Sequence, residues 1–92
     1  MLIGMVRIPL SPEQVAAGQR LGVLMRTARA GRDPELIARN AGISPETLRK
    51  IEVGRMPSPS FGTVIGLCHA LGLPIEDAVD AWHGSATHRM AR

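Results

Sequence analysis

The stretch SPETLRKIEVGR, residues 44–55, carries the side chains of this chain that are best suited to hydrogen bonding with nucleic-acid bases. Arg49 and Lys50 can donate to O6 and N7 of guanine, and Glu46 can accept from the N4 amine of cytosine. Pro45 offers only an apolar contact, such as one to a thymine methyl group. The same residues also fit a solvent-facing helix, on which Glu46 and Lys50 form an ordinary i, i+4 ion pair. We predict that Pro45, Glu46, Arg49 and Lys50 read base edges.

Other polar residues nearby are better suited to phosphate contacts, which position a protein on DNA without specifying a sequence. They are Ser44, Thr47, Arg55 and Ser58. Arg55 has an alternative role, because a cation close to a helix C-terminus also stabilises the helix dipole.

Two short helices joined by a tight turn are predicted to position these side chains. Both helix starts pair a capping residue with Pro and Glu, in Asp33-Pro34-Glu35 and Ser44-Pro45-Glu46. Gly42 can take the positive φ that the turn between them requires. The pattern predicts a helix-turn-helix motif over about residues 34–53. The inward-facing side chains of the motif are expected to be Leu36, Ile37, Ala41, Leu48 and Ile51.

Three further helices are expected around this motif. One begins at the capping box of Ser11 and Gln14 and ends at Gly31, and the others cover about residues 60–71 and 74–82. Their expected buried side chains are Val15, Leu21, Leu24, Met25, Ala28, Phe61, Val64, Ile65, Leu67, Cys68, Leu71, Ile75, Val79 and Trp82. The predicted fold class is therefore all-α with five helices. Residues 11–83 form the domain, residues 1–10 an N-terminal arm or short strand, and residues 84–92 a flexible tail.

Composition excludes several other classes of protein. The chain has 92 residues, enough for one small domain, and its few aromatic residues argue against a β-sandwich and against base stacking on single strands. It has no long apolar run and no signal-peptide pattern, so we expect a cytoplasmic protein. Cys68 is expected to be a core residue. His69, His83 and His88 lack metal-ligand spacing, and no catalytic arrangement is evident, so we expect neither an enzyme nor a metal or cofactor.

Charge is unevenly distributed along the chain. Basic residues outnumber acidic ones between residues 20 and 55, whereas residues 74–82 carry Glu76, Asp77 and Asp80 and no Lys or Arg. Such a separation suits a basic face on the phosphate backbone and an acidic end pointing away from it. Small soluble domains often show uneven charge without this function.

The segment LIARNAGISPETLRKIEVGR, residues 36–55, resembles the Cro/C1-type helix-turn-helix family, also called the XRE or lambda-repressor-like family. The matching elements are Ala38, Ala41-Gly42-Ile43-Ser44, Ile51-Glu52 and Gly54-Arg55, and LGLPIED is similar to a later part of the family's domain. The resemblance implies a five-helix domain that binds duplex DNA sequence-specifically, usually as a dimer, and regulates transcription.

The resemblance also implies roles for single residues. Glu52 is expected to pair with an arginine of the first helix, either Arg26 or Arg29. Pro34 stands where many members have a phosphate-contacting Gln. Only the helix end at Pro34 and Glu35 is then left to contact phosphate through its N–H groups.

A dimer is expected to place two reading helices about 34 Å apart and so to require a palindromic operator. Candidate dimer contacts are Ile3, Val6 and Ile8 of the arm, and Trp82. Trp82 has an alternative position, folded back on the domain core.

Two other functions remain open from the sequence. An antitoxin would combine DNA binding with toxin binding, using the acidic helix of residues 74–82 or the arm as a protein-binding surface. A pure interaction module would have lost DNA binding, as Pro34 and Pro45 would allow.

Overall fold

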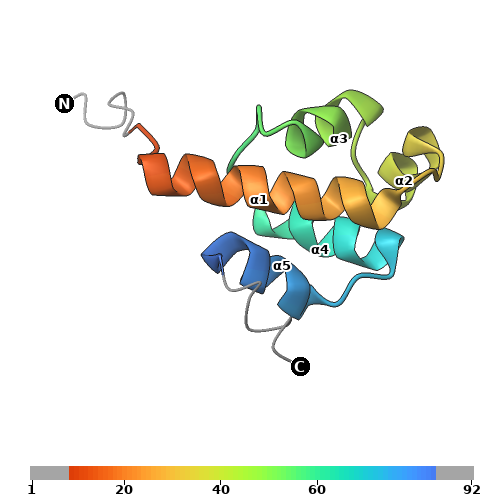
Figure 1. Ribbon diagram of the computed structural model, residues 1–92. Helices are drawn as coiled ribbons and strands as arrows, with labels where there is room; N and C mark the ends of the chain where they lie inside the picture. The colour runs from red at the N-terminus through yellow and green to blue at the C-terminus, as the bar shows by residue number, and fades with distance from the viewer. Residues whose placement is uncertain (1–8, 85–92) are drawn as a thin grey trace.

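Five helices make up the part of the chain that the structure, a computed structural model, describes, which is residues 9–84 (Figure 1). They are α1 (Pro12–Arg29), α2 (Pro34–Ala41), α3 (Pro45–Glu52), α4 (Phe61–Leu71) and α5 (Ile75–His83). The predicted all-α class is confirmed. The expected arm strand lies almost wholly outside the described residues.

Side-chain caps mark the starts of the first four helices, three of them at residues where the sequence predicts a cap. Ser11 and Gln14 make the reciprocal capping box of α1, with Gln14 N–H donating to Ser11 Oγ at 3.1 Å and Ser11 N–H donating to Gln14 Oε1 at 2.9 Å. Asp33 caps α2, Ser44 caps α3 and Ser60 caps α4. Each cap accepts from an N–H that the helix itself leaves unpaired.

The end of α1 differs from the prediction. Gly31 was expected to end this helix, but the residue that takes the positive φ is Ala30, at 53°. The side chain of Arg32 folds back and donates to the carbonyl oxygens of Ala28, at 2.7 Å, and Leu71, at 3.2 Å. These hydrogen bonds stabilise the turn in which Ala30 has a positive φ, a conformation that alanine rarely adopts.

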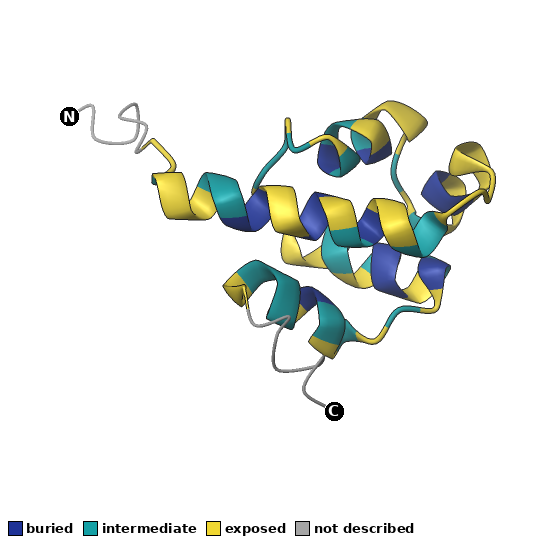
Figure 2. Ribbon diagram, viewed as in Figure 1, coloured by how far each residue is buried: buried dark blue, intermediate teal, exposed yellow. Residues whose placement is uncertain are grey.

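α1 is the central helix, with α3 on one side of it and α5 on the other (Figure 1). α2 packs against both α3 and α4. The interior is apolar, and its largest fully buried side chains are Met25, Leu48, Ile51 and Leu67. α3 turns its buried residues toward α1 and its exposed residues outward (Figure 2).

Four expected core residues, on α2, α4 and α5, are instead exposed. Leu36 on α2 is 48% exposed and Phe61 at the start of α4 is 76% exposed. α2 buries only Ile37 and Ala38, because a two-turn helix meets its neighbours along one narrow side. Ile65 and Val79 are also more exposed than their helical spacing predicts. No helix among residues 9–84 is long and apolar enough to cross a membrane.

Candidate nucleic-acid interface

α3 is held so that one side of it is free. Leu48 and Ile51 are each 1% exposed and fix the inner side of the helix in the core. Gly42, with φ of 79°, turns the chain between α2 and α3, and Ile43 N–H closes the turn on the carbonyl oxygen of Ala38 at 3.0 Å. The predicted base-reading residues lie on the outer side: Pro45, Glu46 and Arg49 are exposed and Lys50 is partly exposed.

Glu46 and Lys50 form the i, i+4 ion pair that the spacing allows. Their Oε2 and Nζ atoms are 3.9 Å apart, and the side chains are 72% and 40% exposed. A pair at this distance and exposure contributes little to stability. Neither side chain is therefore held firmly by the other.

A second ion pair anchors α3 to α1. Arg29 donates from Nε and Nη2 to the two carboxylate oxygens of Glu52, at 2.7 and 3.0 Å. The pair is largely shielded from solvent, with 17% and 7% of the two side chains exposed. The hydrogen bond to Glu52 raises the pKa of Arg29, so this side chain is charged at every relevant pH. Of the two arginines expected to pair with Glu52, Arg29 does so, whereas Arg26 is exposed.

The predicted phosphate-contacting residues do not all lie together. Ser44 Oγ caps α3 and also donates to Thr47 Oγ1 at 2.9 Å, so both hydroxyls are in local hydrogen bonds. Pro34 and Glu35 are exposed at the start of α2, with the N–H of Glu35 taken by the carboxylate of Asp33 at 3.0 Å. Ser58 lies apart from them, in a groove between α4 and α5.

A hollow of about 370 Å³ joins the start of α2 to the outer side of α3. It brings together residues that the sequence separates: Arg29, Pro34, Glu35, Pro45, Glu46, Leu48, Arg49 and Glu52. Within this lining, Arg29 and Glu52 form the largely shielded ion pair, whereas Glu46 and Arg49 are exposed. The arrangement of two capped helices, a glycine turn and an exposed polar helix face is that of a helix-turn-helix motif.

The relationship to known proteins agrees with this geometry. The model of the helix-turn-helix domain family matches residues 16–82. The chain belongs to the helix-turn-helix domain family. The crystal structure of the clp gene regulator ClgR from C. glutamicum is similar, with a TM-score of 0.63 and 29% identity over 85% of this chain and 95% of that one. Comparison with curated proteins gives no match. The predicted Cro/C1-type family is confirmed, and DNA-binding transcriptional regulation is the function that it supports.

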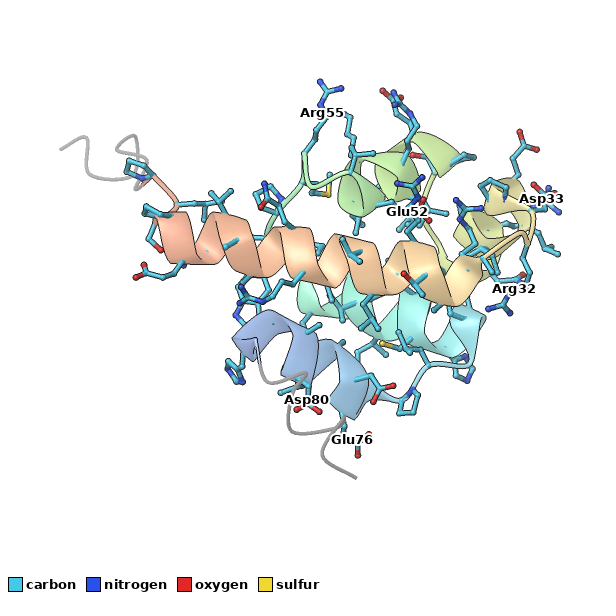
Figure 3. The ribbon with its side chains drawn as sticks, in the orientation of Figure 1. Arg32, Asp33, Glu52, Arg55, Glu76 and Asp80 are labelled. Atoms are coloured by element: carbon cyan, nitrogen blue, oxygen red, sulfur yellow. The ribbon has the colours of Figure 1, made fainter. Side chains whose placement is uncertain are left out.

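Arg55, after α3, and two acidic residues of α5 lie at opposite edges of this helix-turn-helix domain (Figure 3). The side chain of Arg55 extends away from the domain beyond α3, whereas Glu76 and Asp80 of α5 lie at the opposite edge (Figure 3). Backbone N–H groups donate to the carbonyl oxygens of Arg49, Lys50 and Ile51 near the end of α3, and the N–H of Arg55 donates to Lys50 at 2.8 Å. The alternative role of Arg55, in which its charge stabilises the dipole at this helix end, stays a prediction beside the phosphate contact.

Arg20 and Arg32 each donate hydrogen bonds to backbone carbonyl oxygens of other helices, a role that the sequence did not predict. Arg20 donates to the carbonyl oxygens of Ala81 at 2.8 Å and Trp82 at 2.7 Å, and so caps the end of α5 from α1. Arg20 and Ala81 are 61 residues apart in the sequence, so only the folded structure reveals this role. Trp82 is partly buried against the core, as its alternative position required.

Among residues 9–84, no group of histidine, cysteine and acidic side chains is arranged to hold a metal ion. Cys68 is buried in the core, and desolvation, with a smaller effect of Asp77, raises the pKa of its thiol. The thiol is therefore neutral near pH 7.

Proposed function

We propose that this protein is a transcriptional regulator that binds duplex DNA sequence-specifically, by placing α3 in the major groove, and that it acts as a dimer on a palindromic operator. The observation that carries the proposal is the free polar face of α3, held in a fixed position by Leu48, Ile51 and the Arg29–Glu52 pair. Base reading requires such fixed geometry, since hydrogen bonds to base edges tolerate little displacement. The similar ClgR is by its description a gene regulator, which supports the same role.

The base contacts are assigned by side-chain chemistry and exposure. Arg49 and Lys50 donate to guanine, Glu46 accepts from cytosine, and Pro45 contacts a thymine methyl group. Because Lys50 Nζ and Glu46 Oε2 are only 3.9 Å apart, we expect the two side chains to contact adjacent base pairs of the operator.

The phosphate contacts surround this face. The start of α3 at Ser44 and Thr47 approaches one strand of the DNA backbone, as helix N-termini favour anions. Pro34 and Glu35 lie beside it at the start of α2, where the N–H of Glu35 already donates to the carboxylate of Asp33. Arg55 and Ser58, in the segment between α3 and α4, extend the contact. The acidic α5 then points away from the DNA.

We propose a dimer because helix-turn-helix proteins commonly bind palindromic operators as two-fold symmetric pairs, with half-sites about 34 Å apart. The arm residues that we suggested as dimer contacts, Ile3, Val6 and Ile8, lie outside the described residues. Trp82 stays a candidate dimer contact through the part of its side chain that lines a groove, because the rest packs against the core of its own domain.

Selection from a randomised duplex library tests the proposal. We expect an enriched palindrome, whose affinity falls steeply with salt, and loss of one base preference in Lys50→Ala. Arg26→Ala is the matched control, because it removes the same charge from an exposed position on α1. If no motif is enriched, or if both variants change the selected sequence equally, the proposal is wrong.

A further inference from the structure

The hollow between the start of α2 and the outer side of α3 combines two kinds of surface. Pro34, Pro45 and Leu48 contribute carbon atoms to its lining, and its volume of about 370 Å³ leaves room for a methyl group. The same lining holds the exposed side chains of Glu35 and Glu46, whose carboxylates accept hydrogen bonds. The hollow therefore places carbon surface beside hydrogen-bond acceptors.

Glu46 is the carboxylate of this hollow that is best placed to contact a base. The carboxylate of Glu52 already accepts from Arg29, at 2.7 and 3.0 Å, and Glu35 belongs to α2. Glu46 lies in the first turn of α3, its side chain is 72% exposed, and Lys50 Nζ is 3.9 Å away. Residues at the start of a reading helix meet base edges. The proposed function thus brings this acceptor and the carbon surface into the major groove together.

The bases differ in how well their major-groove edges fit such a pair of surfaces. A carboxylate accepts from the amine of cytosine or adenine, but adenine also presents N7, an acceptor that a carboxylate repels. Thymine carries a methyl group on C5 but presents the acceptor O4 where cytosine has its amine. A cytosine methylated at C5 carries the donor and the methyl group side by side. Of these bases, 5-methylcytosine alone matches both surfaces without a repelled acceptor.

We propose that the hollow binds the edge of a 5-methylcytosine, with its methyl group against Pro34 and Pro45 and its N4 amine donating to Glu46. Arg49, exposed in the same lining, donates to O6 and N7 of a neighbouring guanine. The inference rests on the proposed function and refines it, because one modified base replaces the separate thymine and cytosine contacts of Pro45 and Glu46. The protein then reads the methylation state of its operator as well as the sequence.

Selection from two randomised duplex libraries, one made with dCTP and the other with 5-methyl-dCTP, tests the inference. We expect one motif with a fixed cytosine, enriched more strongly from the methylated library. On the selected operator, methylating that cytosine should raise affinity about fourfold, which is the gain from burying one methyl group. Thymine at the same position should bind about tenfold more weakly than 5-methylcytosine, because its O4 faces the carboxylate.

Two variants separate the two parts of the contact. Glu46→Gln can donate to O4 as well as accept from the amine, so thymine and 5-methylcytosine should bind it equally, while the gain from methylating cytosine remains. Pro45→Ser removes the ring and should reduce that gain below about twofold, with the preference over thymine retained. Pro12→Ser is the matched control and should change neither ratio, because Pro12 is the first residue of α1 as Pro45 is of α3.

Each ratio compares two operators on the same protein, so a partial loss of folded protein in a variant does not change it. Equal affinity for the methylated and unmethylated operator would overturn the inference and leave the proposed function standing. So would a methylation gain that Pro45→Ser leaves intact, or wild-type binding to thymine as tight as to 5-methylcytosine. If neither library yields a motif, the proposed function fails and the inference fails with it.

Discussion

The Arg29–Glu52 pair links the reading helix to the body of the domain. Its two hydrogen bonds are short and both side chains are largely shielded, which distinguishes it from the exposed Glu46–Lys50 pair. A carboxylate beside DNA is repelled by phosphates, so Glu52 is tolerated at this surface because Arg29 neutralises it. In the proposed DNA complex, the exposed Glu46–Lys50 pair opens to contact a base, and the shielded Arg29–Glu52 pair keeps α3 in place.

Replacing Arg29 by Met should therefore cost stability. We expect Arg29→Met to lower the free energy of unfolding by about 3 kcal/mol, because Glu52 is left as a shielded charge without a partner. Denaturant titration followed by circular dichroism measures the change. Arg26→Met, at an exposed position of the same helix, should change stability by less than about 0.5 kcal/mol. Equal losses in the two variants would refute the structural role of the pair.

At the scale of elements, the close approach of α1 and α3 depends on a glycine. A Cβ at Gly22 would collide with the carbonyl oxygen of Ile51, near the end of α3. The missing side chain lets the reading helix lie directly on α1, and Leu48 and Ile51 then reach the core. Gly66 plays a similar part where α4 meets the end of α2 at Ala41.

Gly22→Ala should displace α3 from this position. We expect a loss of about 2 kcal/mol in the free energy of unfolding, from overpacking against backbone that cannot move aside, together with weaker operator binding. Thermal unfolding and DNA titration measure the two effects. Gly62→Ala is the control, because open space surrounds that helical glycine and Ala there should be neutral or stabilising by about 0.5 kcal/mol. A harmless Gly22→Ala would show that the contact does not set the position of α3.

For the whole molecule, we propose that the distribution of charge orients the domain on DNA. Arg55 extends from the edge beyond α3, and Glu76 and Asp80 occupy the opposite edge (Figure 3). The net charge of the chain is only +3, so the distribution rather than the total favours one face over the other.

Arg55→Ala should weaken DNA binding without changing which sequence is preferred. Loss of one phosphate contact is expected to reduce the slope of log affinity against log salt by about 1, equally for different operators. Fluorescence anisotropy at several salt concentrations measures the slope. Arg26→Ala should leave it unchanged. A change in base preference in Arg55→Ala would instead make Arg55 a base-reading residue.

Local chemistry in the sequence was sufficient to predict the helices and the reading motif. The caps at Ser11, Asp33 and Ser44 and the glycine turn at Gly42 act over a few residues, so they can be read from neighbouring letters. The spacing of Leu48 and Ile51 likewise identified the inner side of α3. The family resemblance limited the partner of Glu52 to two arginines but did not choose between them.

The tertiary structure decided what depends on distant contacts. It selected Arg29 over Arg26, because only the packing of α3 on α1 shows which arginine reaches Glu52. It also assigned Arg20 to the end of α5. Helical spacing placed Phe61 in the core, but spacing shows only which side chains share a face. Whether another element covers that face is a property of the assembled domain, and at Phe61 residues 9–84 leave it open.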